Sequence, residues 1–269
     1  MSRKQAIALN GSGKSRSNLA LACLILLLIA NPIIRAQDSN NKHHILFIGN
    51  LLITVNSMPN QLKSICQDLG VAPELELTII AKSNVELDYH LKDKDSLNTI
   101  RRGEWDTIVF QAHWLEPLSD YEKFALAAEQ LSQEAKAVNA RVAFFETWAL
   151  QRGGTNDDIL AKEWAGGDFY AMQSRLRAAF EKIARKTGGR VVPVGDAWEL
   201  VVREHPEIIL HSPNGLAPSG CGTYLTACVF TIFLTGEDPR KSTWVPSYRV
   251  TEKEAEILRE VAYRVVSEN

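Results

Sequence analysis

Short apolar runs alternate with longer amphipathic stretches along most of the chain. Five runs have the length and apolar content of buried parallel strands, at residues 44–49, 75–80, 106–111, 141–147 and 190–194. Apolar residues at helical spacing predict helices at residues 57–69, 97–102, 119–138, 168–186, 222–234 and 251–267, with Ser119 as the cap of the third. This alternation predicts an α/β domain with a five-stranded, doubly wound parallel sheet. In such sheets, functional sites form at the carboxyl ends of the strands.

The first 36 residues differ from the rest of the chain in charge. They contain five basic side chains and no acidic one, and residues 19–34 form a mostly apolar run behind the basic region. This pattern predicts a secretory signal that is cleaved near Ala36, so that residues 37–269 form one exported domain, periplasmic or extracellular. The alternative is an uncleaved signal anchor. The run is short for a membrane span of ~20 residues, which favours cleavage and leaves no stable membrane span.

Composition narrows the classes of partner and cofactor. Without the basic N-terminal segment the domain holds 25 basic and 32 acidic residues, and this acidic balance argues against a nucleic-acid partner. No metal is expected, because neither His43-His44 nor the stretch from Asp88 to His90 has a convincing third ligand. No cofactor is expected, since the glycine-rich segment at residues 11–15 lacks the first glycine of a phosphate loop.

Three cysteines, Cys66, Cys221 and Cys228, remain after signal cleavage. An odd number leaves at least one free thiol, or an intermolecular bond, in an exported protein. Cys66 and Cys228 lie in apolar helical patterns, where a buried free thiol is the usual outcome. The sequence therefore predicts no disulfide framework.

The first predicted strand ends in Gly49-Asn50, which is followed by Leu51 and, a few residues later, by Asn56 and Pro59. A strand-to-helix turn of this kind exposes one side chain and directs backbone N–H groups toward it, which suits an attacking oxygen and an oxyanion. The segment resembles the first block of the SGNH/GDSL hydrolases, which in one bacterial exported branch reads Gly-Asn-Ser-hydrophobic-Thr. The resemblance places the nucleophilic serine of the family at Leu51.

Later segments continue this resemblance. Asn84 falls where the family has the glycine of its second block, whose N–H is an oxyanion donor. Residues 103–111 look like the strand of the branch that ends in Gln, so the resemblance implies that Gln111 donates to an oxyanion or a ligand oxygen. Residues 147–148 and 192–198 also match the branch.

The last block carries the remaining catalytic positions of the family. The branch reads Asp-Gly-x-His-Pro-Ser, and this chain has Asn214 at the Asp and Ala217 at the His, within matching flanks. The resemblance covers residues 44–239 and implies the SGNH hydrolase fold, a flavodoxin-like three-layer sandwich. It also implies hydrolysis of acyl esters or acetylated sugars through a serine acyl-enzyme. Leu51, Asn214 and Ala217 together remove the groups for that chemistry.

The leading hypothesis is therefore a protein of this family that is inactive as a serine esterase and binds a small ester, carbohydrate or acyl ligand. Its candidate ligand or oxyanion-site residues follow the strands: Asn50, Asn84, Gln111, His113 and Trp114. The alternative is an active ester hydrolase in which a displaced base, His113 or His211, activates water. A third hypothesis is a structural or interaction protein without a ligand site. The sequence does not determine the oligomeric state.

Overall fold

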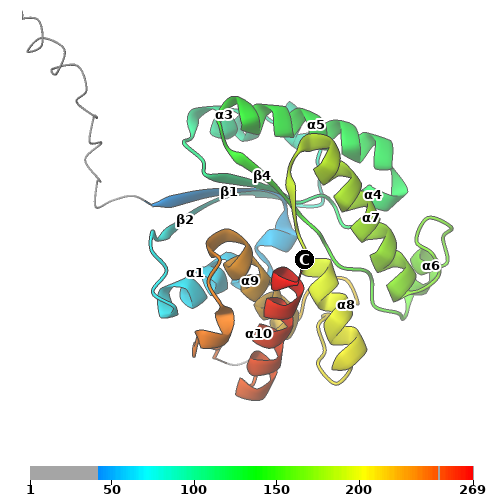
Figure 1. The fold of residues 1–269 in the computed structure, drawn as a ribbon. Helices are drawn as coiled ribbons and strands as arrows, with labels where there is room; N and C mark the ends of the chain where they lie inside the picture. Colours follow the sequence, from blue (N-terminus) through cyan, green and yellow to red (C-terminus); the bar gives the residue numbers. More distant parts are fainter. Residues whose placement is uncertain (1–41, 248, 269) are drawn as a thin grey trace, which may run out of the picture. The chain divides into compact units, whose positions relative to one another are not determined.

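The computed structural model describes residues 42–247 and 249–268, so the predicted signal lies outside the described residues. The sheet consists of β1 (His43–Asn50), β2 (Leu75–Lys82), β3 (Thr107–Phe110), β4 (Arg141–Phe145) and β5 (Arg190–Val192) (Figure 1). All neighbouring strands are parallel, and their order is β2-β1-β3-β4-β5. The predicted five-stranded parallel sheet is confirmed.

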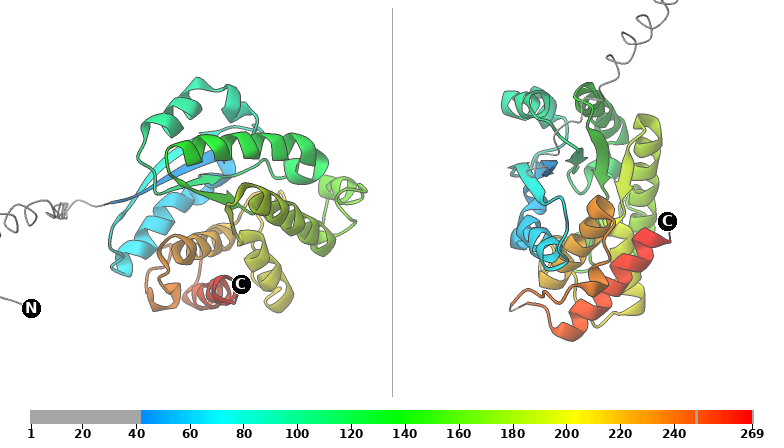
Figure 2. Two further views of the ribbon diagram at one scale, coloured as in Figure 1. Left: turned by 45° about the horizontal axis from the view of Figure 1, so that its top comes forward. Right: turned by 60° about the vertical axis from the view of Figure 1, so that its left-hand side comes forward.

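Helices cover both faces of the sheet and complete a three-layer sandwich (Figures 1 and 2). One face packs against α1 (Met58–Asp68), α8 (Val194–Glu204), α9 (Gly220–Thr235) and α10 (Glu252–Ser267). The other face packs against α3 (Lys94–Arg102), α5 (Tyr121–Ala137) and α7 (Phe169–Thr187). The short elements are α2 (Tyr89–Lys92), α4 (Glu116–Ser119), α6 (Thr155–Leu160) and the 3₁₀ turns η1 (Leu51–Ile53), η2 (Val55–Ser57) and η3 (Pro239–Lys241).

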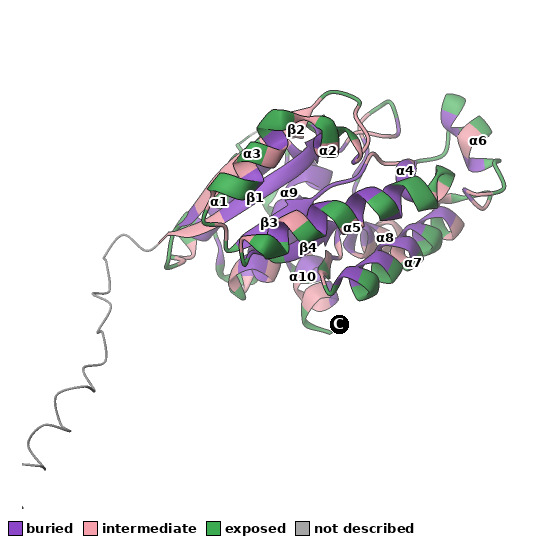
Figure 3. Ribbon diagram, turned by 90° about the horizontal axis from the view of Figure 1, so that it is seen from above, coloured by how far each residue is buried: buried purple, intermediate pink, exposed green. Residues whose placement is uncertain are grey.

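Strand β1 shows why the sheet lies at the centre of the core. Its side chains alternate between faces, so Ile45 and Phe47 belong to one buried cluster and Leu46 and Ile48 to the other. Figure 3 shows the strand buried along nearly all of its length. Helix α9 is also buried nearly all round, which fits its almost continuous apolar sequence.

The structure departs from the sequence prediction at the start of α5 and after β5. Ser119 ends α4 and does not cap α5; the cap is Asp120, whose Oδ1 accepts a hydrogen bond from the Lys123 N–H at 3.2 Å. The fifth strand stops at Val192, and α8 begins at Val194 directly after a proline. Helix α8 was not predicted from the sequence, because its first residues continue the apolar run of the strand.

The described cysteines, Cys66, Cys221 and Cys228, are buried and free, as the sequence predicted for Cys66 and Cys228. Burial raises the pKa of the Cys66 thiol to about 11 and that of Cys228 to about 12, so both are protonated thiols at neutral pH. Among residues 42–247 and 249–268, no helix combines the length and apolar content that crossing a membrane requires.

Candidate functional site

The turn after β1 is held tightly against the end of β3. A Cβ atom on Gly49 would lie 2.5 Å from the backbone oxygen of Gln111, so only glycine allows the two strands to approach this closely. The Asn50 N–H donates to Gln111 Oε1 at 2.8 Å, and the Gln111 side-chain amide donates to the backbone oxygen of Ala112. The Gln111 amide is therefore used to fix the turn, and this buried side chain does not face solvent.

Leu51 occupies the tip of this turn. Asn50 caps the turn, because its Oδ1 accepts a hydrogen bond from the Leu52 N–H at 2.9 Å. Leu51 is the first residue of η1, and its side chain is 46% exposed. A large aliphatic side chain thus projects at the position where the resemblance expects a serine.

The buried imidazole of His90 supports the backbone of the turn at Gly49. His90 Nε2 donates to the Gly49 carbonyl at 3.1 Å, and its Nδ1 lies 2.8 Å from the Ser96 hydroxyl. Both side chains are fully buried, so this hydroxyl–imidazole pair positions the backbone next to Leu51 and offers no accessible nucleophile. From the sequence, the stretch from Asp88 to His90 was rejected as a metal site, and no supporting role of His90 was predicted.

Asn84 lies beside this turn, two residues after the end of β2. The register pairs Asn50 with Lys82, which brings the loop after β2 next to the turn after β1. Asn84 has a φ of 51°, in the left-handed region that glycine adopts most readily and that asparagine tolerates better than most residues. This backbone conformation fits the alignment of Asn84 with a family glycine.

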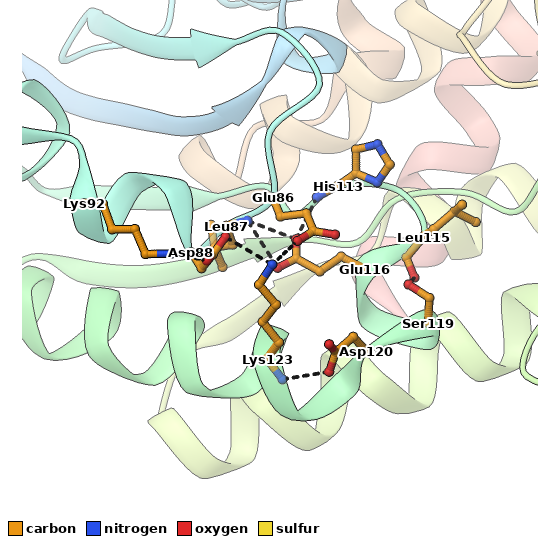
Figure 4. A network of polar contacts seen from close by, with 10 residues as sticks. All are labelled: Glu86, Leu87, Asp88, Lys92, His113, Leu115, Glu116, Ser119, Asp120 and Lys123. Atoms are coloured by element: carbon orange, nitrogen blue, oxygen red, sulfur yellow. Dashed lines mark hydrogen bonds and ion pairs between the residues drawn. The ribbon is translucent and has the colours of Figure 1, made fainter.

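A buried carboxyl joins the loops after β2 and β3 (Figure 4). Glu116 accepts hydrogen bonds from the Leu87 N–H at 3.0 Å and from the His113 N–H at 3.2 Å. Burial raises the pKa of Glu116 to about 7, although these two N–H groups favour the charged form. Lys123 lies close by and pairs with Glu86 and Asp88.

Glu116 was not among the candidate residues predicted from the sequence. Its signal was a single acidic residue inside the otherwise apolar stretch from Trp114 to Leu118. The neighbouring His113 is half-buried, its ring lies 5.5 Å from that of Trp114, and burial lowers its pKa. Both side chains follow β3 at the carboxyl edge of the sheet, as the sequence predicted.

Asn56 brings the first and last blocks of the resemblance together. Its Nδ2 donates to the backbone oxygens of Pro218 and Ser219 at 2.9 and 3.1 Å and to Thr223 Oγ1 at 3.0 Å. These contacts span more than 160 positions of sequence and connect the turn that carries Leu51 to the start of α9.

Asn214 stabilises its own loop. Its Oδ1 accepts hydrogen bonds from the Ser212 hydroxyl at 2.7 Å, the Leu216 N–H at 2.9 Å and the Ala217 N–H at 3.0 Å. The Ala217 oxygen in turn accepts from the Ser212 N–H at 2.7 Å. The loop is thus a closed polar turn in which neither family position carries an acid or a base.

His211 is the displaced base that the structure supports less. Its ring is buried and packs 4.8 Å from the Trp198 ring, and its Nε2 donates to the Ala149 oxygen at 2.9 Å. Burial lowers the pKa of His211 to about 4, so the ring is neutral and its Nε2 proton is engaged. Of the two proposed bases, only His113 is partly accessible.

No protein-family model matches the chain, and no curated protein matches it. Among solved structures, a proposed SGNH hydrolase from Slackia heliotrinireducens has 25% identity and a TM-score of 0.61, covering 73% of this chain and 100% of its own. The chain shares the fold of SGNH/GDSL hydrolase structures.

Two further structures, with lower sequence identity, share the fold of this domain. A DUF4886 family protein from Bacteroides uniformis has a TM-score of 0.70 at 14% identity and covers 84% of this chain and 95% of its own. An acetylxylan esterase from Geobacillus stearothermophilus has a TM-score of 0.53 at 15% identity, with coverage of 73% and 95%. The flavodoxin-like SGNH hydrolase fold predicted from the sequence is therefore confirmed.

Proposed function

We propose that this SGNH-like protein forms no acyl-enzyme and instead binds a small ester, carbohydrate or acyl ligand at the carboxyl edge of its sheet. The observation that carries the proposal is the side chain at the tip of the β1 turn: Leu51, aliphatic and 46% exposed. A leucine has no oxygen to attack a carbonyl carbon, whatever base lies nearby. Export through the predicted N-terminal signal is part of the proposal.

The other two family positions support the same conclusion. Asn214 directs its Oδ1 to three donors of its own loop, and Ala217 has no group that accepts a proton. In enzymes of the triad type, loss of the reactive groups leaves about 10³–10⁴-fold acceleration from binding and oxyanion contacts alone. Only this residual activity is expected here.

The accessible position of Leu51 favours ligand binding over a purely structural role. The exposed leucine leaves apolar surface in contact with water, at an unfavourable free energy of about 25 cal/mol per Å². Trp114 and His113 also remain partly exposed after β3. A ligand with an apolar face would cover this surface.

The proposal is tested on the purified protein with a fluorophosphonate serine probe, p-nitrophenyl acetate and a panel of acyl esters and acetylated sugars. We expect no covalent labelling, no robust turnover, and binding to at least one member of the panel that Leu51→Asp weakens. Leu126→Asp is the matched control, because Leu126 is 58% exposed on α5. Stoichiometric labelling with turnover, or no binding to any panel member, would overturn the proposal.

A second candidate function rests on His113. Burial lowers the pKa of this half-buried imidazole, so it is neutral at pH 7 and able to accept a proton from water. Turnover of p-nitrophenyl acetate without covalent labelling, lost in a folded His113→Ala variant, would favour a hydrolase that uses water directly.

A further inference from the structure

The segment from Gln151 to Gly167 follows the end of β4 and carries α6 between two pairs of adjacent glycines. Figures 1 and 3 show α6 at the margin of the domain, on the side toward which the strands run. This is the side of the sheet that holds the candidate site.

All four glycines have a backbone conformation that other residues rarely adopt. Their φ angles are 127° and 58° for Gly153 and Gly154, and 94° and 99° for Gly166 and Gly167. At Gly153, Gly154 and Gly167 an added Cβ would meet no atom within 4 Å, so lack of space does not explain these glycines. The glycines are instead explained by their positive φ angles, at both ends of the segment, which glycine adopts more readily than other residues.

Asn156 attaches this segment to the loop that carries Asn214. Its Nδ2 donates to the backbone oxygens of Gln151 and Asn214, at 3.1 and 3.2 Å. A Cβ on Gly215 would lie 2.3 Å from this Nδ2, which shows how closely the two loops approach. The Gln151 N–H adds a second connection, to the Gly215 oxygen at 2.9 Å.

Little apolar surface holds the segment to the rest of the domain. Its buried side chains are those of Asn156, Leu160 and Ala165, and the partly buried Ile159 also packs against the core. Exposing these three apolar side chains and breaking a few hydrogen bonds requires much less free energy than unfolding the domain. The segment is therefore suited to opening while the sheet stays folded.

We propose that residues 155–165 form a lid that pivots at the two glycine pairs and is latched by Asn156 to the loop Ser212–Ala217. Opening breaks the bond from Asn156 to the Asn214 oxygen, so the loop loses this support whenever the lid moves, whereas the bond from Gln151 to Gly215 lies before the first pivot. The role of the lid in admitting a ligand rests on the proposed binding function, whereas its coupled opening does not.

Hydrogen exchange of the full chain without ligand, read by mass spectrometry, tests the lid. Asn156→Asp keeps the shape of the side chain but sets a carboxylate oxygen against two carbonyl oxygens. We expect roughly 10-fold faster exchange in residues 155–165 and also in residues 212–217, with exchange in α1 unchanged. Asn98→Asp, the same change at an exposed position of α3, is the matched control and leaves both segments as they are.

Three results would overturn the lid: unchanged exchange in residues 155–165, faster exchange there without any change in residues 212–217, and a uniform increase across the domain. Asn156→Ala, which removes the donor without adding charge, gives the same readout if Asn156→Asp fails to fold. A lid that opens in a protein that binds no member of the ligand panel would refute the proposed function alone.

Discussion

The turn after β1 and the loop before α9 meet at one edge of the sheet, but different contacts hold them. Side chains of other segments, Gln111 and His90, support the backbone of the turn, and the side chain of its tip residue Leu51 makes no polar contact. The loop is fixed from within by Asn214, which accepts three hydrogen bonds of its own segment. The side chain of Leu51 thus has no structural role in its turn, whereas the side chain of Asn214 stabilises its loop.

The largest expected effect concerns the external support of the turn. Gly49→Ala places a Cβ 2.5 Å from the backbone oxygen of Gln111, so that the backbone of one of the two segments must shift. We expect a loss of about 4 kcal/mol in the free energy of unfolding, measured by urea denaturation. Gly70→Ala is the control: nothing lies within 4 Å of its Cβ, and its φ of 68° alone costs about 1 kcal/mol. Equal losses of unfolding free energy in the two variants would contradict the close contact between Gly49 and Gln111.

The next effect depends on pH and tests the hydrogen bonds by which Glu116 connects the loops after β2 and β3. The pKa of Glu116 is raised to about 7 in the folded state, so its contribution to stability is fully present below about 4.5 and is lost as pH rises through 7. Linkage gives roughly 3 kcal/mol for this shift.

Glu116→Gln removes this titration. The stability of the variant relative to the wild-type protein is therefore expected to rise between pH 4.5 and 7, in urea titrations at a series of pH values. Burial also raises the pKa of Glu146, but both proteins contain this group, so the difference between them isolates Glu116. A difference that is constant with pH would contradict the raised pKa.

The loop before α9 gives a smaller effect. Asn214→Ala removes the acceptor of three hydrogen bonds and is expected to lower the free energy of unfolding by about 2 kcal/mol. Asn214→Asp retains the acceptor and is expected to change it by less than about 0.5 kcal/mol. If the two variants were equally stable in thermal unfolding, Asn214 would not hold the loop.

The smallest effect is expected at Leu51. Because its side chain is exposed and makes no polar contact, Leu51→Ser is expected to change the free energy of unfolding by less than about 0.5 kcal/mol. A loss of 2 kcal/mol or more in the same denaturation assay would show that the leucine has a packing role, and the contrast with Asn214 would disappear.

The sequence predicts the strands of this domain because each is a short apolar run, and β1 is buried on both faces as such a run requires. It also places Leu51 and His113 at one sheet edge, since parallel strands all end on the same side. The sequence did not predict the long-range contacts of Asn56 and Gln111. That Asn56 reaches the start of α9 and that Gln111 turns to the β1 backbone depend on contacts between distant segments, which local patterns do not encode.

The central claim is that the site lacks only its reactive groups. The triple variant Leu51→Ser, Asn214→Asp, Ala217→His tests it most directly, through stoichiometry of fluorophosphonate labelling measured by intact mass. The account predicts one label per molecule of the folded triple variant and none on the wild-type protein. Labelling of the wild-type protein, or no labelling of a triple variant that folds normally, would contradict it.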